Sequence, residues 1–350
     1  MSAHSRRMFA TVVRREPVDL ALACHLIAAE AGPETNPAET TRALDALAAD
    51  AAALLAAHRA APRGRDAAGA AAGTGTDTGA ASGAEATAEA ASGDPAADPG
   101  MTERSTADRG TAAGAGAADR GTAAGAGANA GGGTLTGLDL RAAAEALRES
   151  LGRRAGFAGH ESDYDDVRAS LLPEVISRRR GLPILLSIVW IEVARRIGVP
   201  AYAVGLPGHV IVAVGAPHEN VLVDPYAGGE IMTVHDAAAR VRAAGAPFTR
   251  AQLAPMTPDD LLTRVLGNIR VLAARTDVPR TRLWAVELSL LLPRHPAALR
   301  RERGELRVRL GDFLGGAADL TNFADAVTTV EPAAAAAARH SAAAARARLN

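Results

Sequence analysis

The chain has 350 residues, with 38 Arg, no Lys and 39 acidic residues, so its formal net charge is −1. This balance argues against a general nucleic-acid binder, because such proteins carry an excess of basic residues that displaces counterions from phosphates. The single cysteine, Cys24, excludes an intramolecular disulfide and any site with several cysteine ligands. Its apolar helical surroundings indicate a small buried side chain rather than a reactive thiol.

The N-terminus carries basic residues without a following apolar stretch, so it does not have the pattern of a signal peptide. The longest apolar helix candidate, Pro183–Ile197, is interrupted by charged residues and is shorter than a bilayer span. We therefore expect a cytoplasmic protein that does not contact a membrane.

Residues 1–60 contain two helical patterns, at Val18–Ala29 and Thr40–Arg59, with leucines at helical spacing. Two helices alone make a poor domain, so we expect them to dock on the later part of the chain. Residues 61–134 differ sharply, since they contain almost no bulky apolar side chain and a tandem copy of ADRGTAAGAGA. Such a segment cannot offset its ordering entropy, which predicts a disordered linker.

Residues 135–254 mix helices with strands. Helices are expected at Leu138–Leu151 and Asp166–Arg179, and Pro183–Ile197 is apolar almost all round, which is typical of a buried central helix. Alternating patterns then predict three strands, at Ala201–Gly205, His209–Val214 and Val221–Asp224. The sequence therefore indicates an α+β fold in which a central buried helix packs on a small antiparallel sheet.

The C-terminal part has the pattern of successive helices. One is expected at Val234–Ala243, before residues 255–330, where leucines recur at a spacing of about 34 residues, as in tetratricopeptide-type helical hairpins. The further helices are expected at Asp259–Ala274, Arg282–Leu292, Ala298–Leu310 and Ala317–Val327. Residues 331–350 are Ala-rich, and we expect a frayed tail there.

A histidine and an aspartate meet in the predicted hairpin. A six-residue loop, Gly215–Asn220, places Val214 opposite Val221 and gathers the valines on one face. The same register makes His209 and Asp224 diagonal neighbours on the other face, close enough for imidazole and carboxylate to touch. A carboxylate beside an imidazole fixes its tautomer and stabilises the imidazolium, as in the base half of a catalytic triad.

The sequence has no nucleophilic residue at the position where a catalytic His–Asp pair would need one. The start of the buried helix is the natural place, because its dipole lowers a thiol pKa and its free N–H groups can hold an oxyanion. Pro183 occupies that place and has neither a nucleophilic side chain nor an N–H. Ser187, one helical turn further, is a possible replacement nucleophile. The simpler interpretation is a helix hydroxyl that hydrogen-bonds to a backbone carbonyl. A metal site using His209 and Asp224 with His218 or His235 fits no recurring ligand spacing, so we expect no metal and no cofactor.

The stretch RRRGLPILLSIVWIEVARRIGVPAYAVGLPGH, followed by VLVDPYAGG, resembles the bacterial transglutaminase-like proteins of the SirB type. In that superfamily, active members place a cysteine at the start of the core helix, and the strand histidine and strand aspartate follow. Aligning Gly198-Val199-Pro200-Ala201 with the family's Gly-Ile-Pro-Ala-like step puts Pro183 at the cysteine position. His209 then aligns with the histidine and Asp224 with the aspartate.

The resemblance implies a papain/transglutaminase-like core that has lost its thiol, with tetratricopeptide-like helices after it. We expect a non-catalytic binding or regulatory module whose pocket holds a peptide or protein partner. Its residues would be the pair His209 and Asp224, Pro183 at the nucleophile position, and Ser187, Gly208 and Tyr226 as lining. Two alternatives stay open: a hydrolase or acyltransferase using the pair with water or Ser187, and a structural adaptor in which only the helical repeats bind.

Overall fold

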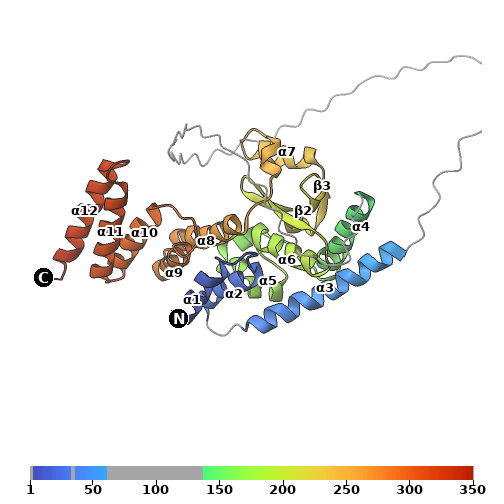
Figure 1. The fold of residues 1–350 in the computed structure, drawn as a ribbon, viewed down its shortest axis with the longest axis horizontal. Coiled ribbons are helices and arrows are strands. Elements are labelled where there is room, and N and C mark those ends of the chain that lie inside the picture. Colours follow the sequence, from blue (N-terminus) through green and yellow to red (C-terminus); the bar gives the residue numbers. More distant parts are fainter. Residues whose placement is uncertain (1–2, 33–35, 61–136, 350) are drawn as a thin grey trace, which may run out of the picture. The chain divides into compact units, whose positions relative to one another are not determined.

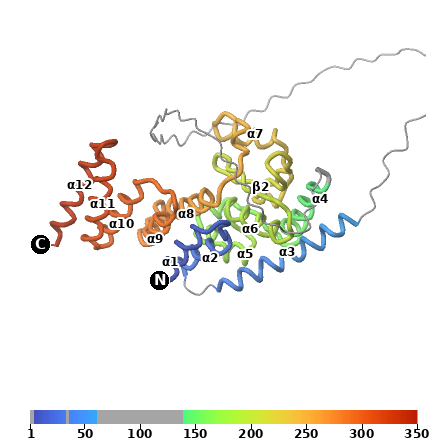
Figure 2. Tube along the Cα trace, viewed as in Figure 1, coloured from blue at the N-terminus to red at the C-terminus, as the bar shows by residue number. Residues whose placement is uncertain are grey.

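The computed structural model describes residues 3–32, 36–60 and 137–349; the predicted linker lies outside the described residues (Figure 1). The N-terminal helices are α1 (Ala3–Val12), α2 (Leu20–Ala31) and α3 (Pro37–Ala60). Their apolar side chains belong to the same buried cluster as those of α6 (Pro183–Arg196), and α2 and α3 both contact α6 (Figure 2). The N-terminal helices thus complete the core around α6.

The chain between residues 137 and 181 is more irregular than the two long helices that its sequence predicts. Helix α4 (Gly137–Leu147) runs on into the π-helical η1 (Arg148–Arg154), close to the expected bounds. The expectation of one helix over Asp166–Arg179 is wrong. Two short turns, η2 (Glu161–Asp165) and η3 (Val167–Ser170), precede α5 (Leu172–Arg178), because Pro173 favours a helix start at this point.

Helix α6 has the central place that its all-round apolar sequence predicts. Pro183 is its first residue, and its side chains from Ile184 to Trp190 are fully or almost fully buried. The helix ends before Gly198, which has a φ of +70°, and Val199 donates its N–H back to the carbonyl of Ala194. A glycine in this left-handed conformation is a common helix terminator.

The sheet is antiparallel, in the order β1 (Ala201–Leu206), β2 (His209–Ala216), β3 (Glu219–Asp224) and β4 (Glu230–Met232). Val212 pairs with Val223 and Val214 with Val221, which confirms the predicted register. The prediction of a six-residue loop is wrong, however, because both strands are longer than expected and only Pro217 and His218 connect them. The extension changes no pairing, because the loop shortens by two residues on each side.

The two faces of the sheet pack against different helices. Valines of β2 and β3 share the buried cluster of α6, as the hairpin pattern predicts. The other face, with Ile211, Ala213 and Leu222, packs against Ala237 and Val241 of α7 (Val234–Ala243). The sheet is therefore covered on both sides, which keeps the His209 end of β2 away from bulk water.

The remaining helices are α8 (Pro258–Arg275), α9 (Pro279–Ser289), α10 (Ala298–Arg309), α11 (Phe313–Val327) and α12 (Pro332–Ala347), with a short turn η5 (Arg250–Leu253) before them. Helices α10, α11 and α12 pack in succession (Figure 1). The expected frayed tail at 331–350 is wrong. Alanine is the best helix former, and the methyl groups of Ala335, Ala338, Ala342 and Ala345 are buried in the cluster that α12 shares with α11.

Candidate functional site

The turn between β1 and β2 presents His209. Leu206 and His209 pair across it, and Gly208 takes a φ of +68°, which residues with a side chain rarely adopt. Arg264 of α8 fastens this turn, since its Nη2 donates to the carbonyl oxygens of both Leu206 and His209, each at 3.0 Å. The backbone of His209 is thus held from two sides.

Asp224 ends β3 and starts the 3-10 turn η4 (Pro225–Ala227). Its Oδ1 accepts a hydrogen bond from the N–H of Tyr226 at 3.0 Å. Its carboxylate also lies 3.0 Å from the Nη2 of Arg240, on α7. The Asp224 side chain is 1% exposed, so a buried charge is satisfied by a helix-cap contact and an ion pair.

The predicted contact between His209 and Asp224 is present. Nε2 of the imidazole lies 3.0 Å from both carboxylate oxygens. The other ring nitrogen, Nδ1, forms no hydrogen bond with the described residues, and 7% of the His209 side chain is exposed. The pair therefore has the geometry of a base with its orienting acid, although access to it is narrow.

Tyr226 lies beside this pair. Its ring meets the His209 ring edge-on, with centroids 5.8 Å apart, and lies 6.4 Å from the ring of Tyr164. Burial raises the pKa of both tyrosines. Gly159 lies flat against the Tyr226 ring, where a Cβ would come within 1.8 Å of a ring carbon. Two glycine-containing motifs, GFAG and DPYAGG, meet at this ring.

Pro183 and Ser187 lie on the first turns of α6. The Ser187 hydroxyl is fully buried and donates to the carbonyl of Val210 at 3.4 Å. This agrees with the interpretation of Ser187 as a helix hydroxyl bonded to a backbone carbonyl. This contact places the start of α6 beside the His209 end of β2. The N–H of Leu182, just before Pro183, donates to the carbonyl of Ala169 at 3.0 Å, so it is not free to bind a ligand.

A small pocket opens at this end of α6. It has a volume of about 120 Å³ and is lined by residues from η2, η3, α8 and the residue before α6: Asp163, Tyr164, Ser170, Leu182, Asn268, Val271, Leu272 and Arg275. A water molecule takes roughly 30 Å³ in the liquid, so the pocket has room for about four waters or one side chain.

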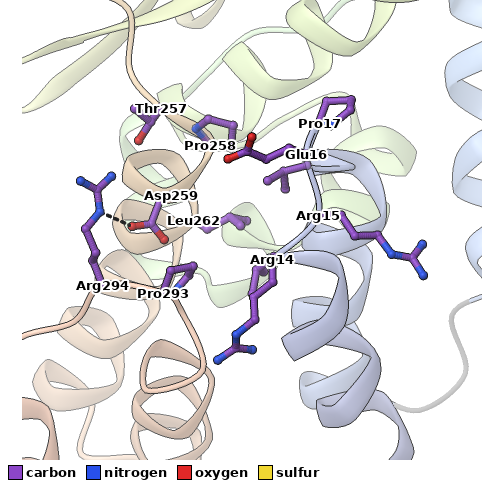
Figure 3. A pocket seen from close by; sticks show the side chains of 12 residues that line it. Arg14, Arg15, Glu16, Pro17, Thr257, Pro258, Asp259, Leu262, Pro293 and Arg294 are labelled. Carbon is purple, nitrogen blue, oxygen red and sulfur yellow. Dashed lines mark ion pairs between the residues drawn. The ribbon is translucent and has the colours of Figure 1, made fainter. Parts of the chain in front are cut away.

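A larger cavity, of about 970 Å³, lies away from His209, between the loop after α1 and the start of α8 (Figure 3). In Figure 3 the Glu16 side chain points toward Thr257 and Pro258, whereas Arg14 and Arg15 point away from them. Asp259 pairs with Arg294 at 3.5 Å on the far wall. No sequence pattern indicates this cavity, because it is formed by segments some 240 residues apart in the chain.

Comparison with known families identifies two parts of the chain. The model for the transglutaminase-like superfamily matches residues 128–267, and the tetratricopeptide-repeat model matches residues 269–350. The chain carries a transglutaminase-like domain followed by tetratricopeptide repeats. The mostly helical fold with its four-stranded sheet agrees with both matches, as the SirB-type resemblance implies.

The transglutaminase-like domain has relatives among proteins known as UPF0162. One from Xylella fastidiosa is 34% identical over 51% of this chain and 66% of its own length, and one from Pseudomonas aeruginosa is 32% identical over 41% and 54%. The F-box only protein 21 of Mus musculus is 27% identical over 43% of this chain and 25% of that protein. The matches thus span less than two thirds of each of these relatives. No solved structure matches the chain.

Three residues of the transglutaminase-like domain that contact the site were not predicted from the sequence. Arg240 pairs with Asp224, Arg264 binds the His209 turn, and Tyr164 stands beside Tyr226. A hydrophobic pattern shows which face of a helix is buried, but not that an arginine on its border reaches a distant turn. Among the residues that the structure describes, no group of three or more His, Cys, Asp or Glu side chains could hold a metal ion.

Proposed function

We propose that this protein is a binding or regulatory module in which a transglutaminase-like domain has kept its His–Asp pair and lost its nucleophile. The site formed by His209, Asp224 and Tyr226 would bind a peptide segment of a partner protein. The tetratricopeptide repeats would offer a second protein-binding surface, since stacked helical repeats form extended surfaces for partners. The observations that support the proposal are the intact contact between His209 and Asp224 and the presence of a proline, Pro183, as the first residue of α6.

The described thiol and hydroxyl groups near α6 give covalent catalysis little support. Pro183 has no reactive group. Burial raises the pKa of Cys24, which is 1% exposed on α2, so it stays a thiol. The Ser187 hydroxyl is fully buried and engaged with a strand carbonyl. An acyl-enzyme is therefore not expected to form.

A second candidate is a hydrolase or acyltransferase in which His209 activates water. The Nδ1 of His209, which bonds to none of the described residues, favours it, since a base needs one free nitrogen while the other is oriented by a carboxylate. The narrow exposure of the imidazole weighs against it. The same narrow exposure favours the third possibility, an adaptor in which only the repeats bind.

We place the protein in the cytoplasm, with no nucleic-acid partner and no cofactor. The near-neutral net charge argues against a nucleic-acid partner. Within the described part of the chain, no helix combines the length and apolar character needed to span a membrane.

The test incubates the full chain with a nitrophenyl ester, a peptide amide and a glutamine donor with hydroxylamine. We expect no turnover above that of His209→Ala. Turnover that His209→Ala abolishes would replace the proposal with the hydrolase, and labelling of Ser187 by a serine-directed probe would assign the nucleophile.

A positive measurement complements this assay. Partner proteins captured by the wild-type chain are compared with those captured by Tyr226→Ala, which removes the ring beside His209, and by Leu314→Ala, which changes an exposed side chain of the repeats. Loss of a partner with Tyr226→Ala alone supports binding at the His209 site, and capture unaffected by Tyr226→Ala supports the adaptor.

A further inference from the structure

The 970 Å³ cavity between the loop after α1 and the start of α8 is poor in hydrogen-bond donors (Figure 3). Three of its lining residues, Pro17, Pro258 and Pro293, are prolines, which have no N–H group. Several other backbone N–H groups of the lining are already bonded within the fold, namely those of Val13, Arg14, Arg15 and Thr257. A ligand that enters this cavity therefore meets few backbone donors.

The Glu16 side chain brings an unpaired negative charge to this cavity. In Figure 3 it points toward Thr257 and Pro258, on the other side of the cavity. Glu16 is exposed, and its carboxylate forms no hydrogen bond or ion pair with the described residues. Because an ionised carboxylate can only accept hydrogen bonds, the group that complements it best is a cation that donates them.

The carboxylate of Asp259, in the wall formed by α8, is only weakly compensated. Its Oδ2 lies 3.5 Å from Nε of Arg294, whose side chain is 77% exposed. Its other oxygen, Oδ1, is buried and has no hydrogen-bond partner among the described residues. An ion pair with so exposed a partner is screened by water, so this wall keeps much of its negative charge.

The remaining charges of the lining do not cancel these carboxylates. The side chains of Arg14 and Arg15 point away from Thr257 and Pro258 in Figure 3, and Nη1 of Arg14 donates to the carbonyl of Ala10 in α1. Apolar surface comes from the side chains of Val13, Val18 and Leu262. The cavity thus combines negative charge with an apolar wall.

We propose that this cavity binds a small organic cation, in which a primary ammonium group is attached to an apolar body. The ammonium group donates three hydrogen bonds and accepts none, so it suits the Glu16 carboxylate and a lining with few donors. The volume lies within the range of about 300–1,000 Å³ found for sites of drug-sized ligands, which favours a small molecule over one side chain of a partner. The inference goes beyond the proposed function, because the cavity shares no lining residue with the site of His209 and Asp224.

The experiment titrates phenylbutylamine, phenylbutanol and phenylbutyrate into the full chain and follows the methyl NMR signals of Val13, Val18 and Leu262. These signals locate binding at the cavity. The three compounds share an apolar body and differ in an end group that is cationic, neutral or anionic. A fourth ligand, acetyl-Ala-Leu-Lys-Leu-Ala-amide, presents the ammonium group on a peptide.

We expect phenylbutylamine to bind about fivefold more tightly than phenylbutanol, as is typical of one partly exposed ion pair. Glu16→Gln should remove this preference. Arg294→Gln should increase it, because Asp259 then lacks its counterion. Glu331→Gln is the matched control, since Glu331 is also an exposed glutamate directly before a proline, and it should leave all affinities unchanged.

Equal affinities for the amine and the alcohol, tighter binding of phenylbutyrate, or a preference that survives in Glu16→Gln would overturn the inference. The absence of any shift in the three methyl signals at millimolar amine would do the same. Tighter binding of the lysine peptide than of phenylbutylamine would assign the cavity to a protein partner and contradict a small ligand. If Glu16→Gln loses its native spectrum, Arg294→Gln decides, since a preference that does not increase there contradicts attraction by the carboxylates.

Discussion

The imidazole of His209 and the carboxylate of Asp224 meet at one end of the sheet, with Nε2 3.0 Å from each carboxylate oxygen. His209 begins β2 and Asp224 ends the neighbouring antiparallel strand, so the pairing register alone brings them together. Arg240 approaches the same carboxylate from α7. The pair is therefore also a structural junction between sheet and helix.

Asp224→Ala should strongly destabilise the protein. The change leaves the buried His209 imidazole and the N–H of Tyr226 without their acceptor, and the partly exposed Arg240 guanidinium without its counterion. Breaking such a buried pair costs about 3–5 kcal/mol. Urea unfolding should show this decrease in the free energy of unfolding. Arg240→Ala, which removes a guanidinium that is 42% exposed, should cost about 1 kcal/mol. Equal effects of the two changes would contradict the central place of Asp224.

Cys24 should resist thiol reagents in the native protein. Its side chain is 1% exposed, and burial raises its pKa, so little thiolate forms at neutral pH. A disulfide reagent should release no chromophore from the folded chain and one equivalent after unfolding in urea. Rapid reaction of the folded chain would show that the α2 region opens readily.

Pro183→Cys should create one reactive thiol per chain and leave Cys24 silent as an internal control. A cysteine at the first position of α6 would lie at the positive end of the helix dipole, which favours the thiolate. We expect alkylation of the introduced thiol at a rate that falls when His209→Ala is added, because His209 would then no longer serve as its base. Labelling that is independent of His209 would show that position 183 is not the nucleophile position of this fold.

The hairpin was predictable from sequence because two constraints coincide there. The valines of β2 and β3 must share the face that packs on α6, and a strand's side chains alternate with a period of two. Any shift by one residue would have placed the valines on the wrong side. The register that buries them also fixes the diagonal contact of His209 with Asp224.

Other features had no such local signal. Helix α12 is mostly alanine, so its sequence shows little contrast between apolar and polar faces, and only packing against α11 distinguishes Ala338 from Ala337. Arg264 looks like any helix arginine until the turn that it binds is in place. Long-range partners of this kind follow from the assembled fold and not from periodicity.

Ala338→Asp and Ala337→Asp test the packing of α12. Ala338 is 4% exposed against α11, whereas Ala337, the residue before it, is exposed. Aspartate has the same helix propensity at both places, so the difference between the variants reports burial of a charge alone. Hydrogen exchange of the α11 and α12 amides should accelerate by at least a factor of about 30 in Ala338→Asp, corresponding to roughly 2 kcal/mol. Equal exchange rates in both variants would contradict this packing and would support the frayed tail that the sequence predicts for residues 331–350.

The start of α8 should make stability depend on pH. Thr257 and Asp260 form a capping box, in which the Thr257 hydroxyl donates to Oδ2 of Asp260 at 2.6 Å. This hydrogen bond lowers the pKa of Asp260 below its ordinary value of 3.8. Because the folded state holds the proton less tightly than the unfolded state, the stabilisation is complete above that value and is lost as the pH falls through the folded-state pKa.

Asp260→Asn should therefore lower the free energy of unfolding at pH 7 by about 0.5–1 kcal/mol, an amount typical of an exposed cap. The difference in the free energy of unfolding between this variant and the wild type should disappear as the pH falls below 3.8, because the wild-type carboxyl becomes neutral as well. Urea unfolding across the acid range measures both values. Glu305→Gln, an exposed change in the middle of α10, should stay within about 0.5 kcal/mol of the wild type at each pH. If the stability difference between Asp260→Asn and the wild type does not vary with pH, the effect comes from the shape of the capping side chain and not from its charge.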